Sequence, residues 1–258
     1  MSSWANIHKW VVRYSDESQH NADLDELRNI MEVEPINTTT DRGNTALHFA
    51  AIGTSTRILS YLVTKASPSL INTPNDLGET PLHWACSSGS TSHLRILLRA
   101  GADTGSVDCF QNSILHFAVQ SGNSPVTKFL LRKKLCEVNT PNFEGKTALS
   151  IACEEHETQL IKLLVRYGAS RTELLRYYVG INEPKIVKAL LFKNKEINLN
   201  DKQQNPLHYA VSFNHYKGAK VLIQVNSLWK QETDNNGNTP GSLLRNTSDK
   251  RLAKLLAC

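Results

Sequence analysis

Residues 78–89 read GETPLHWACSSG, and variants of this string recur along the chain. The variants are NTALHFAAIG from Asn44, NSILHFAVQSG from Asn112, KTALSIACEE from Lys146, NPLHYAVSF from Asn205 and a weaker NTPGSLL from Asn238. The leucines that they share, Leu47, Leu82, Leu115 and Leu149, follow one another at steps of 35, 33 and 34 residues. The next, Leu207, comes 58 residues later, close to two periods with a piece missing. A fixed period in the low thirties predicts a stacked repeat protein.

The physics of one repeat predicts a turn followed by two helices. Asn75–Gly78 is a turn string, in which Gly78 is free to take a positive φ. Thr80 stands at the N-cap of a first helix, LHWACSS, and Gly89 ends that helix. A second helix, SHLRILLRA, carries its leucines on one stripe and closes at Gly101. Helices of about ten residues are unstable alone, so the units must stack to bury their leucines.

The turn–helix–helix unit, the Thr-Pro-Leu-His string, the Gly-Ala-Asp after the second helix and the period together resemble the ankyrin-repeat family. The resemblance is specific at residues 41–171, returns at 205–226 and again, in part, at 234–256. It implies an all-α repeat solenoid of about six to seven stacked units with caps, each a hairpin plus two antiparallel helices. We expect one domain over 1–258, divided into an N-terminal helical cap (1–38), regular repeats (39–73, 74–105, 106–139, 140–171), a shortened repeat (172–199), a further repeat (200–231) and a C-terminal capping repeat (232–258).

Composition narrows the class of protein. The 258 residues are 40% hydrophobic, enough for a core, and the net charge is +5. Residues 1–41 hold eight acidic and three basic residues, whereas the rest holds 26 basic and 16 acidic. No apolar run approaches a membrane span or a secretory signal, and five cysteines without a CxxC pattern suit a reduced compartment. We expect a cytoplasmic protein, with the nucleus, or a host cytosol for an effector, as alternatives.

One histidine recurs per repeat, at His48, His83, His116 and His208, and Ser150 replaces it once. A metal or catalytic interpretation would require these side chains to converge, whereas the period spreads them about one repeat apart. We favour a brace, in which each imidazole bonds backbone at the base of a hairpin. Sequence motifs for nucleotide binding or hydrolysis are missing, so we expect no catalytic residue, no cofactor and no metal site.

The family resemblance implies a protein-binding surface made by the hairpin tips and the exposed side of the first helices. The tip positions are Asp41, Arg42, Asn44, Asp76, Leu77, Glu79, Cys109, Phe110, Asn112, Phe143, Glu144 and Lys146. The first-helix positions are Ile52, Ser87, Ser88, Gln120, Ser121, Glu154, Glu155 and Phe213.

Leu77, Phe110 and Phe143 are bulky apolar residues on the turns of three successive repeats, where polar residues are usual. Either each side chain folds down onto a neighbouring hairpin, or the three form an interface, which we favour. We therefore expect a non-catalytic adaptor, scaffold, assembly factor or effector, a monomer on its own, that binds a protein partner of unknown identity.

Two alternatives stay open. The spacing of Leu131, Glu137, Val138 and Asn139 resembles the pattern that asparaginyl hydroxylases modify in ankyrin repeats, and Asn198 lies in a looser copy, so both are candidate modification sites. The alternative is that both asparagines have a structural role and brace the turns between repeats. The basic residues Lys128 and Arg132–Lys134 end a second helix. Either these cations stabilise the helix end through the helix dipole, or they bind an acidic partner or an anionic membrane surface. We expect no binding of nucleic acid.

Overall fold

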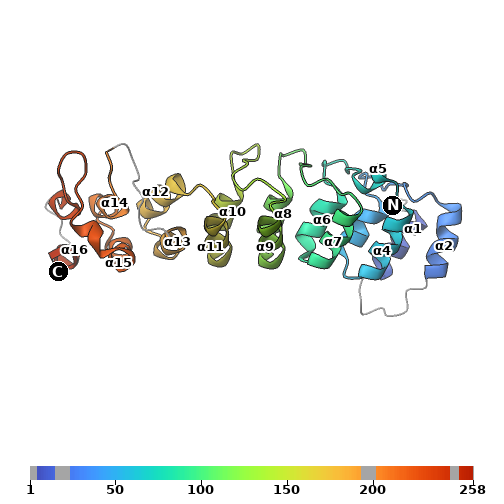
Figure 1. Cartoon of the computed structure of the whole chain (residues 1–258), viewed down its shortest axis with the longest axis horizontal. Helices are drawn as coiled ribbons and strands as arrows, with labels where there is room; N and C mark the ends of the chain where they lie inside the picture. The colour runs from blue at the N-terminus through green and yellow to red at the C-terminus, as the bar shows by residue number, and fades with distance from the viewer. Residues whose placement is uncertain (1–4, 15–23, 193–201, 245–249, 258) are drawn as a thin grey trace. The chain divides into compact units, whose positions relative to one another are not determined.

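The computed structural model describes residues 5–14, 24–192, 202–244 and 250–257, and its elements are short helices (Figure 1). Within the described ranges, the only β-type pairings are two isolated bridges, Thr39 with Thr45 and Val107 with Ser113. The chain packs into two compact units, residues 1–151 and 152–258. This architecture confirms the predicted all-α repeat fold, while the single domain and its repeat boundaries stay a prediction.

The first unit consists of an N-terminal helix pair and three further pairs. The N-terminal pair is α1 (Asn6–Tyr14) and α2 (Leu24–Val33). The further pairs are α3 (Ala46–Ile52) with α4 (Thr56–Lys65), α6 (Pro81–Ser88) with α7 (Thr91–Arg99), and α8 (Ile114–Gln120) with α9 (Ser124–Lys133). The short α5 (Pro68–Ile71) follows α4, and α10 (Ala148–Glu154) contains the boundary between the units. First helices pack on first helices, α3 on α6 and α6 on α8, so the pairs stack in sequence order.

The second unit continues the same helical pattern. Its elements are α11 (Thr158–Arg166), α12 (Thr172–Gly180), α13 (Pro184–Leu190), α14 (Pro206–Ser212), α15 (Tyr216–Val225), the 3₁₀ helices η1 (Ser227–Lys230) and η2 (Pro240–Leu243), and α16 (Lys250–Ala257). The expected shortened repeat thus contains its two helices, α12 and α13. Stacking holds here too, because α12 packs on α14 and α13 packs on α15.

The recurring leucines form the core of each unit. All five of the leucines that set the period are buried in the first helices, at Leu47, Leu82, Leu115, Leu149 and Leu207. The second helices contribute a matching set, Leu62, Leu97, Leu130, Leu164 and Leu222, which are fully buried. Burial of each leucine contributes roughly 1.5–3 kcal/mol, and only stacking supplies it.

The recurring histidine joins one repeat to the next. His48 Nδ1 accepts a hydrogen bond from the backbone N–H of Thr45 at 3.1 Å, at the start of its own helix. Its Nε2–H donates to the carbonyl of Glu79, in the following hairpin, at 2.9 Å. His116 makes the same two bonds, from Ser113 N–H and to the Lys146 carbonyl, each at 3.1 Å. These contacts confirm the predicted brace at His48 and His116, and His208 makes the bond to the next hairpin at the Asn238 carbonyl, whereas the buried Nε2 of His83 makes no such bond.

Ser150 stands where the histidine is replaced, and its side chain reaches only its own repeat. Its hydroxyl donates to the carbonyl of Thr147 at 2.8 Å. The boundary between the compact units, after Ile151, lies in this same helix. The loss of the imidazole therefore coincides with the division of the chain.

Turns without a glycine after the first helix still form. His156 and Asn214 take φ values of 56° and 58°, the left-handed conformation that glycine usually supplies. Asparagine accepts this conformation more readily than most residues, and both turns keep the same place in the repeat.

A membrane-spanning helix needs a long apolar run, and none of the helices in the part of the chain that the structure describes has the length and hydrophobicity for it.

We expect stability to fall as the pH is lowered from 7 to 5. Burial lowers the pKa of His48 to about 4 and also lowers that of His83 and His116. Between pH 6.5 and 4 the unfolded chain therefore binds protons that the folded chain does not, so acid favours unfolding. His48 alone should remove about 2 kcal/mol of unfolding free energy between pH 7 and 5.

Urea unfolding at several pH values measures this effect, with His48→Gln as the comparison. The variant should show a shallower loss of stability with acid, because one titrating brace is gone. Equal slopes for the two proteins would contradict the assignment of the effect to His48.

Candidate functional site

Successive hairpin tips of the first unit are joined by backbone hydrogen bonds. The N–H of Asp76 donates to the carbonyl of Arg42 at 3.1 Å. The N–H of Cys109 donates to Leu77 O at 2.8 Å, and that of Phe143 to Phe110 O at 3.0 Å. Four tips therefore form one continuous edge, which we call the tip edge (residues 41–44, 76–79, 109–112 and 143–146). The hydrogen bonds fix the distance between neighbouring tips.

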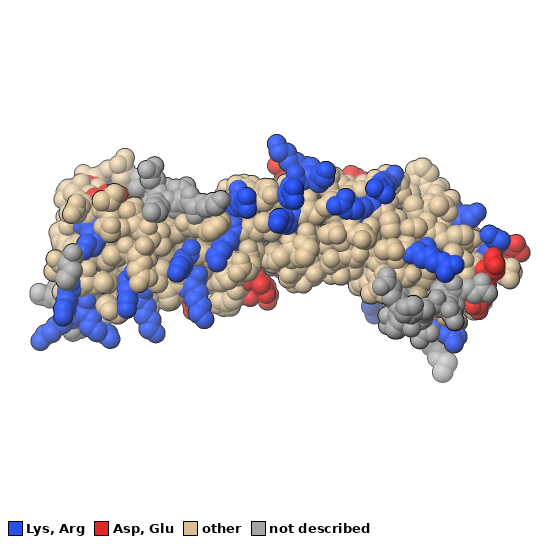
Figure 2. All heavy atoms as spheres, turned by 60° about the horizontal axis from the view of Figure 1, so that its bottom comes forward, with Lys and Arg blue, Asp and Glu red and all other residues tan. Residues whose placement is uncertain are grey.

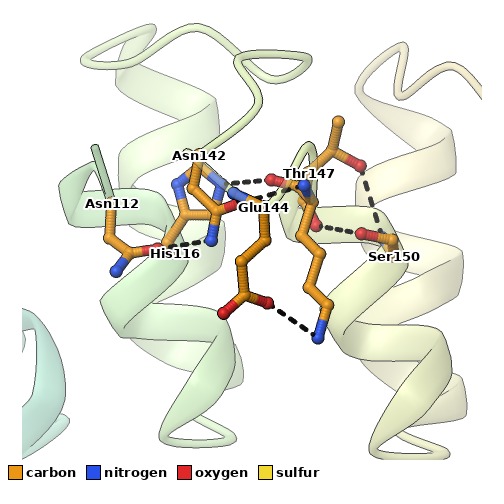
Figure 3. A network of polar contacts seen from close by, with 7 residues as sticks. Asn112, His116, Asn142, Glu144, Thr147 and Ser150 are labelled. Carbon is orange, nitrogen blue, oxygen red and sulfur yellow. Dashed lines mark hydrogen bonds and ion pairs between the residues drawn. The ribbon is translucent and has the colours of Figure 1, made fainter. Parts of the chain in front are cut away.

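An Asn or Asp side chain closes three of the four tips from inside, and the hydroxyl oxygen of Thr40 does so at the first. Oδ1 of Asn142 accepts the N–H of Glu144 at 3.0 Å and that of Lys146 at 2.9 Å (Figure 3). Asn75 and Asp108 do the same in the two preceding hairpins. Such turns hold the loop shape without secondary structure. This recurring Asn or Asp is a periodic signal in the sequence, but its role in closing the hairpin follows only from the structure.

Side-chain amides add a second link between hairpins. Nδ2 of Asn142 donates to Oδ1 of Asn112 at 2.9 Å (Figure 3). Asn75 makes the same bond to Asn44 in the first two hairpins. Asn44 is buried and Asn112 is half-buried. Both had been expected at a binding surface, but their amides are engaged within the protein. We therefore leave Asn44 and Asn112 out of the proposed surface.

Gly78 is required at the second tip for two reasons. Its φ is +78°, and a Cβ placed there would lie 2.8 Å from the backbone nitrogen of Cys109. The neighbouring hairpin thus approaches the Gly78 backbone more closely than any side chain would allow.

The three apolar tip residues point into solvent. Leu77, Phe110 and Phe143 are 49%, 57% and 72% exposed. None of the three is buried, and their role as an interface stays a prediction. Backbone bonds along the tip edge, one of which joins Phe110 to Phe143 directly, order these side chains along it. Clustered exposed apolar side chains of this kind mark interfaces.

Charged residues border the apolar tips. Lys146 Nζ pairs with Glu144 at 3.2 Å (Figure 3), and Asp41, Arg42 and Asp76 are exposed. Glu79 is less available, because its Oε2 accepts hydrogen bonds from the Trp84 indole at 2.7 Å and from Asn75 at 2.9 Å. The exposed thiol of Cys109 lies on the same edge. A polar rim around an apolar centre is the usual anatomy of a protein interface.

The first-helix positions differ in exposure. Ile52 is 50% exposed and Gln120 and Ser121 are exposed, whereas Ser87 and Ser88 are half-buried. Glu154, Glu155 and Phe213 are exposed as well, but they belong to the second unit. The tip edge therefore brings together the tip candidates, all of which lie in the first unit, and does not include the first-helix candidates.

The second unit exposes an apolar pair that we had not singled out. Tyr177 and Ile181, on and just after α12, are 60% and 49% exposed and line a shallow pocket with Tyr209. The sequence signal was the missing hairpin of the shortened repeat, which leaves α12 without a tip of its own.

Burial, not metal binding or reactivity, accounts for the cysteines inside the repeats. Burial raises the pKa of the thiols of Cys136 and Cys153 to about 12, and also raises that of Cys86. Thiols of such high pKa are inert nucleophiles. In the part of the chain that the structure describes, no group of three His, Cys, Asp or Glu residues is placed to hold a metal ion.

The two candidate modification sites differ in what the structure shows. Asn139 is exposed, between α9 and α10. Asn198 lies outside the described residues. Both stay predictions.

Comparison with known protein families identifies the class. Matches to "Ankyrin repeats (3 copies)" cover residues 18–108, 92–173 and 175–247, so the chain belongs to the ankyrin-repeat family. Ankyrin repeats are, in general, protein–protein interaction modules.

Individual relatives are similar over part of their length. The chain is 28% identical to the nuclear factor NF-kappa-B p105 subunit of Mus musculus over 162 residues, 61% of this chain and 14% of that protein. It is 36% identical to I-Kappa-B like protein C2 of Microplitis demolitor bracovirus over 77 residues, 30% and 42% of the two chains. It is 29% identical to inversin of Canis lupus familiaris over 126 residues, 45% and 12%. The chain thus spans less than half of each of these relatives.

Removing one tip-closing side chain should destabilise the hairpins. Asn142→Ala loses bonds to two backbone N–H groups and one to Asn112, so we expect a loss of about 2 kcal/mol in unfolding free energy. Asn142→Asp keeps the acceptor oxygen, as Asp108 does naturally, and should cost about half as much. Urea unfolding of the three proteins measures the difference, and equal losses for Ala and Asp would rule out the proposed role of the Oδ1 acceptor.

Proposed function

We propose that this chain is a non-catalytic adaptor, scaffold, assembly factor or effector that binds a protein partner through the tip edge. The observation that carries the proposal is the exposure of Leu77, Phe110 and Phe143 on consecutive hydrogen-bonded tips. Membership of the ankyrin-repeat family supports a protein as the ligand. The relatives are different proteins that match over different lengths of this chain. They support an interaction module as the class of protein, but they do not identify its partner.

The rigidity of the tip edge favours tight binding. A flexible loop must lose conformational freedom on binding, whereas tips held by backbone and Asx hydrogen bonds are already ordered. Large apolar anchors near the centre of an interface commonly dominate its binding energy. The edge therefore suits a partner segment with apolar side chains spaced to meet Phe110 and Phe143 and with charges of both signs at its border.

The first-helix side extends this surface. Ile52, Gln120 and Ser121 are exposed on α3 and at the end of α8. A partner seated on the tips would meet these residues next, as the family resemblance implies. Glu154, Glu155 and Phe213 are exposed in the second unit and stay separate candidate positions of that unit. A reduced location, in the cytoplasm or nucleus, is part of the proposal and is supported by the free buried thiols.

Serine substitution at the three tips should abolish partner binding without unfolding the protein. The test captures proteins from native-cell extract with the intact chain and with Leu77→Ser, Phe110→Ser, Phe143→Ser, read by mass spectrometry. We expect the partner on the first bait and a loss of roughly 100-fold or more on the second, because hot-spot anchors contribute about 2 kcal/mol or more each.

The matched control replaces three exposed apolar side chains of the second unit, Tyr177→Ser, Ile181→Ser and Leu228→Ser. It should hold the partner as the intact chain does. If the tip variant retains the partner at an unchanged melting temperature, the tips are not the interface. If it melts early, the tip side chains are structural and the proposal fails.

An alternative role is that of a substrate for an asparaginyl hydroxylase at Asn139, which the exposure of this side chain favours. Protein purified from its native cell should then carry one added oxygen at Asn139. Asn142 lies close by in sequence but outside the leucine–acid–valine–asparagine spacing, so it should stay unmodified. Tandem mass spectrometry separates the two sites, and an unmodified Asn139 at full sequence coverage would exclude this role in that cell.

A further inference from the structure

The second helices of the pairs that follow the N-terminal pair carry basic residues and no acidic ones. In the first unit, α4, α7 and α9 contain no Asp or Glu, and their cations are Arg57, Lys65, Arg95, Arg99, Lys128, Arg132 and Lys133. The second helices of the other unit, α11, α13 and α15, are also free of acids and carry Lys162, Arg166, Lys185, Lys188, Lys217 and Lys220. In Figure 2, blue Lys and Arg side chains predominate over red Asp and Glu where the second helices come forward.

Two adjacent helices of the first unit place these cations in register. Arg95 and Arg99 are four residues apart on α7, and Lys128 and Arg132 are four apart on α9, so each pair shares one helix face. Lys128 lies one repeat after Arg95, at the equivalent position. Because α7 and α9 pack against each other, the two pairs form neighbouring rows.

A groove lies between the two rows. It has a volume of about 540 Å³ and is lined by Thr91, Arg95, Pro125, Lys128, Phe129, Arg132 and Lys133. The guanidinium of Arg95 lies over the ring of Phe129, 4.7 Å from its centre. The groove thus combines four cations with one half-buried aromatic surface.

No carboxylate from the neighbouring helices compensates these cations. Apart from each other, the helices that pack most extensively on α7 and α9 are α4, α6 and α8, and none of these three contains Asp or Glu. Among the described residues, the ion pairs join other groups, such as Arg28 with Asp25 and Lys146 with Glu144. Four cations around one groove repel each other, and an anionic ligand would relieve that repulsion.

We propose that the groove between α7 and α9 binds an acidic segment of a protein. Carboxylates of the segment would pair with Arg95, Lys128, Arg132 and Lys133, and an apolar side chain would lie against Phe129 and Pro125. This surface lies on the second helices, away from the hairpin tips, so it is separate from the tip edge and its occupant is a second ligand or a second segment of one partner.

The shape of the groove favours a peptide over a membrane. A flat bilayer meets protruding groups, and peripheral proteins add exposed apolar residues that enter the acyl region. Neither α7 nor α9 carries an exposed large apolar side chain; those of the first unit lie elsewhere, three of them on the tips. A groove lined by Phe129 and Pro125 as well as by cations instead fits the side chains of an extended segment.

Binding of a short fluorescein-labelled peptide, rich in glutamate with one central phenylalanine, tests the proposal by fluorescence anisotropy. Lys128→Glu with Arg132→Glu should weaken binding at least roughly tenfold, because two charge-assisted contacts become repulsive. The matched control, Lys185→Glu with Lys188→Glu on α13, changes net charge equally on exposed helical lysines of the second unit. It should change the affinity less than about twofold.

Three results would overturn the proposal. One is a peptide affinity that both charge-reversal variants weaken equally, which would indicate general positive charge. Another is no peptide binding even at low salt by a chain whose melting temperature is normal. The third is tighter binding, lost in the groove variant, to phosphatidylserine vesicles or to single-stranded RNA than to the peptide. The serine variant of the three tips should keep peptide binding, so failure of the groove and failure of the tip edge are distinguishable.

Discussion

The buried imidazole that joins a hairpin to the previous repeat, at His48 and at His116, is the contact on which the first unit depends. His48 and His116 each accept a backbone N–H at their own helix start and donate to a carbonyl in the next hairpin. Both ring nitrogens are satisfied away from water, which requires the neutral ring. Loss of either partner would leave a buried polar group without a bond, a penalty of about 1–3 kcal/mol. The brace therefore fixes the spacing of the repeats as well as stabilising them.

That spacing sets the properties of the two surfaces proposed for the first unit. At the tips, it allows Cys109 and Phe143 to donate to the preceding hairpin, and the apolar side chains of Leu77, Phe110 and Phe143 are presented outward from an ordered backbone. Along the second helices, the same spacing aligns Arg95 with Lys128 across the groove between α7 and α9. One surface is apolar with a mixed rim and the other is basic, so they suit ligands of different chemistry.

The fold could be predicted from the sequence because the residues that recur with its period are the buried ones. Leu47, Leu82 and Leu115 recur at nearly one spacing, and each must be buried to stabilise a short helix. The histidine brace was predictable for the same reason, since a polar residue that recurs in a core must find a fixed partner. Ser150 could be seen as a departure, but its coincidence with the boundary of the compact units required coordinates.

The candidate site was predicted less completely, because exposure in a turn is not encoded by spacing. The residues that flank Phe110 and Phe143 in the sequence allow each ring to lie outward or inward. Only the geometry of the hairpin decides the orientation of the rings. Asn44 and Asn112 occupy tip positions yet turn their amides toward the next hairpin. The groove depends on how α7 and α9 pack. The sequence therefore indicates the basic residues of α9, but it does not indicate that Arg95 of α7 lines the same groove.

Amide hydrogen exchange of the free chain, measured by NMR, tests most directly whether the tips form an ordered edge before any partner binds. The informative amides are those of Asp76, Cys109 and Phe143, which are exposed residues whose N–H groups donate to the preceding tip. The account predicts that all three exchange far more slowly than in an unstructured peptide. Exchange at the unstructured rate, in a chain whose helices are protected, would show that the tips move independently and would contradict the account.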